Sequence, residues 1–289
     1  MKSSRLFACA LALFLPLAAL AQEDPGIEWT AGPTKADLGS NLAQIDVPEG
    51  YVFADGPNTR KLMELYGNPA TDREVGAIAP KAEGKNWLVV FEYEESGYVK
   101  DDDKDKIDAD AILKSITEGT EASNEQRKEM GSDAIHIVGW FEQPHYDSKT
   151  NNLVWAIEGK DDPGGNRFVN YDVRLLGRRG YMSATLITGP ESLAADLPEV
   201  NGLLSGFSYK TGNRYAEWVK GDKVAEYGLT ALVAGGAGAA AVKLGLFAKL
   251  GKMLAKGWKL VVAGIAALIA LLRKLFGKKE EEAPTVAAP

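Results

Sequence analysis

The feature that most constrains this chain is an apolar segment near its C-terminus. Residues 227–247 form a run of 21 residues that carries one charge, Lys243. As a helix this run would be about 31 Å long, which matches the roughly 30 Å hydrocarbon core of a bilayer. Lys243 lies near one end, where its long side chain can reach the headgroups. The run therefore predicts a transmembrane helix, because the rest of the chain could not cover it on all sides.

A second apolar block, residues 258–276, follows after a short basic stretch. Lys249, Lys252 and Lys256 lie between the two blocks, and Lys259 lies at the start of the second; their spacings of three and four place all four on one helix face. Two arrangements stay open: a two-helix hairpin, or one span followed by a helix in the membrane interface. In either case residues 223–279 form a membrane anchor, and residues 280–289 form a tail.

The N-terminus has the three parts of a secretory signal peptide. Lys2 and Arg5 precede an uncharged apolar run, and the small residues of the Ala19–Ala21 stretch offer a cleavage site before Gln22. Residues 1–21 are thus expected to be removed on export. Cys9, the only cysteine of the chain, lies within them, so the mature protein would carry no thiol, disulfide or cysteine-based metal site.

Charge separates the region between these ends from both of them. Residues 22–222 contain 21 Lys and Arg against 36 Asp and Glu, a net charge of −15. Such a domain is repelled by nucleic acid and by anionic headgroups, which excludes nucleic-acid binding. The basic C-terminal part suits a membrane surface instead.

The patterns within residues 22–222 predict an α+β domain, an antiparallel sheet with helices packed on it. The turns DDPGGN (161–166) and GRRG (177–180) indicate hairpins between neighbouring strands. Strands are expected at 41–47, 51–54, 87–93, 135–141, 153–158, 168–176, 181–188 and 207–209. Helices are expected at 59–66 and 109–117, with helical turns at 192–195 and 199–204.

The residue types of metal sites and hydrolases are present without the required spacing. Counted from Asp101, a calcium loop needs Gly at place six and Glu at place twelve, where the chain has Lys106 and Ile112. We interpret the acidic stretch as a solvated loop that leads into a helix capped by Asp108. His136 and His145 are the only histidines, and no Gly-x-Ser-x-Gly occurs. No metal and no cofactor are expected.

The strand 168–176 alternates between apolar and polar residues, so the two kinds of side chain lie on opposite faces. Its polar face is open to two interpretations: a ligand-binding surface, or the solvated side of an ordinary antiparallel strand. On the first interpretation the candidate binding surface consists of His145, Tyr146, Asn170, Asp172, Arg174 and Arg178.

Several motifs carry a resemblance to a known family. They are Gly97-Tyr98-Val99 before Asp101, Ile107-Asp108-Ala109-Asp110, Asn124-Glu125-x-Arg127, Gly139-Trp140 with Pro144-His145-Tyr146-Asp147, Leu153-Val154-Trp155-Ala156, and Asn170-Tyr171-x-Val173-Arg174-Leu175-Leu176-Gly177-Arg178. In this order they resemble a family of membrane-anchored bacterial proteins classed as a domain of unknown function. The resemblance implies a bacterial origin and an envelope location, and it implies no activity.

A second resemblance concerns the fold alone. The stretches Asp46-Val47-Pro48-Glu49-Gly50-Tyr51 and Leu203-Leu204-Ser205-Gly206-Phe207 are similar to the edges of the α/β sandwich of the Mog1 and PsbP proteins. Those proteins are binding and assembly factors, but a shared fold does not establish function.

Together these patterns predict a protein anchored in the bacterial inner membrane, with its main domain facing the periplasm. We expect it to act as a binding or scaffolding protein for another envelope component, with the lipid bilayer as its second partner. The alternative is a periplasmic hydrolase-like enzyme that uses Asp172, His145 or Arg174. Convergence of these three side chains in one place would favour the enzyme, and their separation would favour the binding protein.

Overall fold

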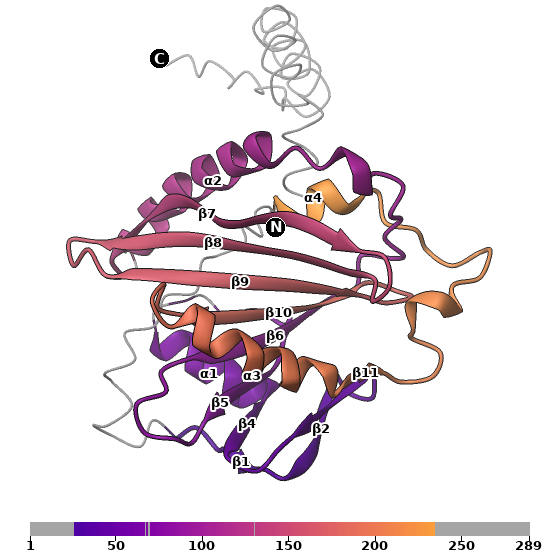
Figure 1. Cartoon of the computed structure of the whole chain (residues 1–289), viewed down its shortest axis with the longest axis horizontal. Coiled ribbons are helices and arrows are strands. Elements are labelled where there is room, and N and C mark those ends of the chain that lie inside the picture. Colours follow the sequence, from indigo (N-terminus) through magenta and orange to yellow (C-terminus); the bar gives the residue numbers. More distant parts are fainter. Residues whose placement is uncertain (1–25, 67, 69, 130, 235–289) are drawn as a thin grey trace, which may run out of the picture. The chain divides into compact units, whose positions relative to one another are not determined.

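The computed structural model describes residues 26–66, 68, 70–129 and 131–234 (Figure 1). These residues belong to the first of two compact units, which ends at Ala240. The predicted signal peptide, the second apolar block, the tail and most of the first predicted membrane helix lie outside the described residues. Within the described ranges, no helix is both long enough and apolar enough to cross a membrane.

An antiparallel sheet of eight strands forms the centre of the domain, and it confirms the predicted α+β class (Figure 1). Three of its strand pairs are joined by short turns, including the two turns predicted at 161–166 and 177–180. In spatial order the strands are β1 (Thr30–Ala31), β4 (Tyr51–Asp55), β5 (Glu74–Pro80), β6 (Leu88–Glu94), β10 (Tyr181–Thr188), β9 (Arg167–Leu176), β8 (Asn152–Asp162) and β7 (Ala134–Asp147).

One face of this sheet, called the first face here, carries the main core. A second sheet of three strands covers it, made of β11 (Phe207–Tyr209), β3 (Ala43–Val47) and β2 (Thr34–Leu38), together with α3 (Leu193–Ser205). Phe91, Ala184, Val173 and Val154 lie side by side across four strands and are buried beneath this layer. The Tyr209 hydroxyl donates to the Leu175 carbonyl and accepts from the Met182 amide, both at 2.7 Å, and so fastens β11 to the large sheet.

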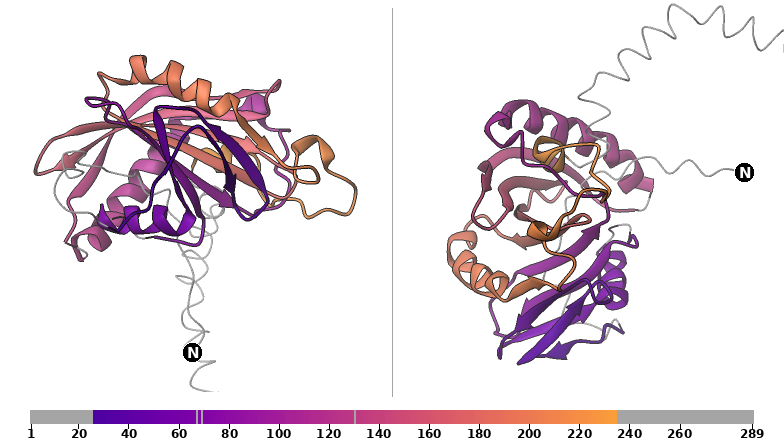
Figure 2. Two further views of the ribbon diagram at one scale, coloured as in Figure 1. Left: turned by 90° about the horizontal axis from the view of Figure 1, so that it is seen from below. Right: turned by 90° about the vertical axis from the view of Figure 1, so that its right-hand side faces the viewer.

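The opposite face, called the second face, is covered by helices near its two ends. The helix α1 (Gly56–Leu65) packs on β4 and β5, and α2 (Ala109–Glu129) packs on β7. Figure 2 shows α1 and α3 on opposite sides of the large sheet. Each helix start has an aspartate cap: Asp55 accepts from the Asn58 amide, and Asp108 from the Ala111 amide, as predicted for Asp108.

The described fold continues past Asp222 to Ala234. Val224 pairs with Tyr98, and the short helix α4 (Leu229–Val233) begins where the Asp103 carboxylate accepts from the amides of Leu229 and Thr230. Leu229 and Leu232 are buried in a second core, called the α4 cluster, with Val99, Ile112, Leu153, Trp155, Leu176, Tyr181 and Val233. Residues 227–234, the start of the first predicted membrane helix, are therefore packed against the domain.

Several elements differ from those predicted. The two helical turns expected at 192–195 and 199–204 are one helix, α3, which continues through Pro198. The helix expected at 109–117 runs on to Glu129, and the strand expected at 135–141 runs on to Asp147. The strands β1, β2 and β5 were not predicted.

Candidate functional site

Polar side chains cross the middle of the second face, between the parts that α1 and α2 cover. The strand register places Glu92, Ser183 and Arg174 side by side on β6, β10 and β9. Two residues further along β10 and β9, it places Thr185 beside Asp172. Directly paired residues of antiparallel strands share a face. We call the set the charged row: Arg73, Glu74, Glu92, Glu94, Asn170, Asp172, Arg174, Ser183 and Thr185.

The alternation predicted for strand 168–176 is present, but its polar face is not solvated. Asn170 is 4 % exposed, and Asp172 and Arg174 are each 7 % exposed. The interpretation as an ordinary half-solvated strand is therefore wrong. This interpretation failed because the helices α1, α2 and α4 cover the edges of this face and enclose the strands between them.

Asp172 and Arg174 form a buried ion pair on β9. Arg174 Nη1 lies 3.0 Å from Asp172 Oδ1, and the Thr185 hydroxyl donates to the same oxygen at 2.8 Å. The Arg174 guanidinium carbon lies 4.6 Å from the centre of the Trp155 ring and 5.9 Å from that of Tyr181. Electrostatic attraction to aromatic rings is strongest where water is excluded, so both rings help to hold this cation.

Glu92 is one of two partly accessible carboxylates of the row: 28 % of its side chain is exposed, against 38 % for Glu94. Arg73 is its nearest cation, but Arg73 Nη2 stands 3.7 Å from Glu92 Oε1, beyond hydrogen-bond length. Burial raises the pKa of the Glu92 carboxyl. Arg73 and Arg174 oppose that shift, whereas the carboxylates of Glu74 and Asp172 add to it.

Two buried polar atoms of the row have no hydrogen-bond partner among the described residues. They are the amide oxygen of Asn170 and Nε of Arg174. Buried polar atoms nearly always have a partner, so each unpaired one asks for an explanation. By contrast, the Glu74 carboxylate accepts two bonds from the Thr71 amide and one from its hydroxyl.

Apolar side chains flank the charged row on both sides. On the α1 side they include Leu62, Met63, Leu88, Val90 and Ile187. On the other side lies the α4 cluster, with Trp155 and Tyr181 at its border. A few polar groups between apolar walls are the usual composition of a ligand-binding site.

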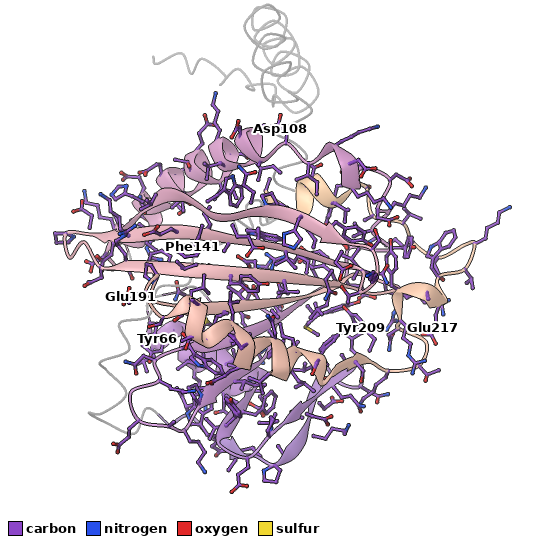
Figure 3. All side chains as sticks on the ribbon, in the orientation of Figure 1. Tyr66, Asp108, Phe141, Glu191, Tyr209 and Glu217 are labelled. Atoms are coloured by element: carbon purple, nitrogen blue, oxygen red, sulfur yellow. The ribbon has the colours of Figure 1, made fainter. Side chains whose placement is uncertain are left out.

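His145 lies apart from Asp172 and Arg174. It is paired with Val154, whose side chain is in the core of the first face, so His145 is on the opposite side of the sheet from the charged row. Its side chain is 54 % exposed, and Nδ1 stands 3.3 Å from the Glu142 carboxylate. It was predicted in a turn but belongs to β7, the strand on which Phe141 is also exposed (Figure 3).

Tyr146 and Arg178 have structural partners of their own. Tyr146 packs against the α4 cluster, where burial raises the pKa of its hydroxyl, and it donates to Asn151. Arg178 holds Asp222 with two bonds of 2.7 and 2.9 Å, and these bonds lower the pKa of Asp222 to about 2. Of the six predicted site residues, the structure thus brings together Asn170, Asp172 and Arg174.

The acidic loop that precedes α2 serves local structure. Asp103 caps α4 through three bonds, from the Leu229 amide and from the amide and hydroxyl of Thr230, and Asp108 caps α2. In the part of the chain that the structure describes, no three His, Cys, Asp or Glu side chains are arranged to hold a metal ion.

Sequence reasoning missed the other six residues of the row: Arg73, Glu74, Glu92, Glu94, Ser183 and Thr185. A usable signal was present for two of them, because the GRRG turn at 177–180 fixes how β9 and β10 pair. With Leu176 opposite Tyr181, Ser183 must lie beside Arg174 and Thr185 beside Asp172. Glu92 and Arg73 depend on the pairing of β6 with β10 and β5, which no short turn determines.

Comparison with solved structures finds similar folds at low identity. The PsbP protein of the cyanobacterium Synechocystis is 11 % identical, with a TM-score of 0.38 over 61 % of this chain and 92 % of that one. The Ran-binding protein Mog1p of Saccharomyces cerevisiae is 10 % identical, with a TM-score of 0.32 over 62 % of this chain and 96 % of that one. These are the two fold-level resemblances expected from the sequence.

Comparison by sequence points to one family. No curated protein matches the chain. Residues 30–266 match a protein family that is described only as being of unknown function, DUF2167. The match covers the described domain almost completely, and the chain belongs to this family, DUF2167.

Proposed function

We propose that this protein is exported, stays anchored in the bacterial inner membrane, and binds another envelope component through the charged row of its periplasmic domain. The observation that carries the proposal is the row itself. Charged groups are costly to bury, and a sheet face made only of apolar side chains would pack against helices equally well. Packing alone therefore does not explain why the row is charged. Groups with perturbed pKa values in such places are more often found at functional sites.

The membrane part of the proposal rests on the sequence of the two ends. The family match runs to residue 266, so it includes the whole of the first predicted membrane helix. The docking of residues 227–234 on the domain takes these residues out of the span predicted for 227–247, so a membrane anchor would have to be formed by the residues that follow them.

The separation of His145 from Asp172 and Arg174 favours a binding protein over a hydrolase-like enzyme. General acid–base or nucleophilic catalysis needs its groups within hydrogen-bond reach of one another or of the same substrate atom. His145 lies on the other side of the sheet, so it cannot act with the pair on β9.

Photo-crosslinking in intact cells tests the proposal. A photoreactive amino acid would replace Glu94, whose side chain is 38 % exposed at the rim of the row, and in a matched strain Lys35, which is 56 % exposed on β2. We expect an adduct with an envelope component from position 94 and none from position 35, and Glu92→Gln should weaken the adduct. Equal adducts from both positions, or no adduct from position 94, would contradict the proposal.

A further inference from the structure

We propose that the charged row binds an alkylammonium group, of the kind at the end of a lysine side chain or of an aliphatic diamine. This inference rests on the row being the binding site proposed above, and it adds the chemical class of the ligand.

The balance of charges in the row leaves a positive charge missing. The row holds four carboxylates, those of Glu74, Glu92, Glu94 and Asp172, and two guanidinium groups, those of Arg73 and Arg174. Arg174 is hydrogen-bonded to Asp172. The Arg73 guanidinium nitrogens lie 3.7 Å from a carboxylate oxygen of Glu92 and 3.5 Å from one of Glu94. An added cation would therefore be attracted to the row, most strongly where water is largely excluded.

The unpaired amide oxygen of Asn170 lies four residues from Arg174 along β9, whereas Glu92 is level with Arg174, so Asn170 is out of reach of a group bound at Glu92. The Glu92 carboxylate and the second oxygen of Asp172 receive no hydrogen bond from the described residues. An ammonium group has three donors and no acceptor, so it supplies what these oxygens lack.

The surroundings favour an organic cation over a metal ion. Among the described residues, no three carboxylates or histidines stand close enough to hold a metal ion. The apolar side chains of Leu88, Val90 and Ile187 border the row, and they suit the methylene groups that carry an ammonium head. Tyr181 adds an aromatic ring on the other border.

Calorimetric titration of the full-length protein in detergent micelles tests the inference. The probes are three four-carbon molecules that differ in their end groups: 1,4-diaminobutane, 1,4-butanediol and succinate. We expect saturable binding of the diamine and none of the diol or of succinate. Glu92→Gln should weaken diamine binding about tenfold or more, which corresponds to about 1.4 kcal/mol, and Glu95→Gln, an exposed neighbour outside the row, should leave it unchanged.

The outcomes separate this inference from the proposed function. Two results would overturn the cation assignment: binding of succinate in place of the diamine, or diamine binding that Glu92→Gln does not weaken. In either case a crosslinked adduct from position 94 would still show that the row is a binding site. Loss of that adduct when the diamine is added to membranes supports the assignment and identifies the group as a lysine of the partner. If the diamine binds but the crosslinked adduct persists, the cation assignment is also supported, and the ligand is then a free amine rather than a lysine of the partner.

Discussion

Arg174 is the residue that links the parts of the charged row. It pairs with Asp172, lies over Trp155 and faces the carboxyl of Glu92. Arg174→Met would keep much of the volume but would leave Asp172 buried with Thr185 as its one partner among the described residues. Removing one member of a buried ion pair usually costs about 3–5 kcal/mol, because the other charge is left uncompensated.

We therefore expect Arg174→Met to lower the free energy of unfolding of the fragment 22–234 by about 3 kcal/mol in urea titrations. Asp172→Leu added to this change removes the stranded charge and should restore most of the loss. A cost below about 1 kcal/mol for the single change, or no recovery in the double variant, would show that the pair is not buried as described.

Prediction of single residues succeeded where the pattern of one strand determines which face a side chain lies on. It failed where the environment of that face depends on several elements that are distant in sequence. The alternation of residues 168–176 correctly separates Val169, Tyr171 and Val173 from Asn170 and Asp172. Whether the polar side meets water depends on which elements cover it. That covering is made by α1, α2 and α4, which are distant in sequence, so a period of two could not reveal it.

At the level of elements, α4 is stabilised from outside rather than by its own sequence. It has five residues, which is too short for a helix to be stable alone, and its first amides are bonded to Asp103, more than a hundred residues earlier. Gly228 is also required here, because a Cβ at this position would stand 2.6 Å from the Asp103 carboxylate.

Asp103→Ala should therefore release α4 while the large sheet stays intact. Loss of an N-cap carboxylate costs about 0.5–2 kcal/mol. We expect amide hydrogen exchange to become faster at residues 229–233 and to stay unchanged in β9 and β10. Asp105→Ala is the matched control, since Asp105 is exposed on the same loop. If exchange at 229–233 is equal in the two variants, the cap does not hold the helix.

The elements that sequence patterns missed have weak local signals and strong tertiary contacts. β5 contains Gly76, which lowers strand propensity, but a Cβ at that position would stand 2.5 Å from the Phe53 ring, so close packing of β4 and β5 explains the glycine. The second half of α2 is polar and carries Gly119. It is held instead by contacts from β7, where the Asn124 side chain bonds both the amide and the carbonyl of Ile135.

For the whole molecule, the boundary of the folded domain decides which fragment is stable. Residues 22–222 contain every predicted strand and helix of the domain, but Leu229, Leu232 and Val233 are buried in the α4 cluster. Burial of one such side chain contributes about 1.5–3 kcal/mol, which is partly offset by the entropy lost when residues 223–234 become ordered. We expect the fragment 22–234 to be the more stable of the two.

Urea titrations of the two fragments measure this difference. Both should be soluble without detergent, and neither should respond to reducing agents, because Cys9 is absent from both. Equal stability of the two fragments would mean that residues 223–234 do not contribute to the core.

The central claim is that the charged row is kept for binding at some expense of stability, and the carboxyl of Glu92 makes this measurable. Its pKa is raised above the ordinary 4.5, so the folded chain binds this proton more tightly than the unfolded chain. The stability that this carboxyl contributes is complete below about pH 4.5 and is lost as the pH rises through its folded pKa. Glutamine at this position cannot lose a proton and avoids that loss.

The deciding measurement is the free energy of unfolding of wild-type and Glu92→Gln protein between about pH 4 and pH 8, with Glu95→Gln as the exposed control. We predict that the Glu92→Gln protein matches wild type near pH 4 and is more stable than wild type near pH 8, and that the control shows no such trend. A Glu92→Gln protein that is less stable than wild type by about 2 kcal/mol or more near pH 8, the usual loss for a structural charged hydrogen bond, would contradict the claim.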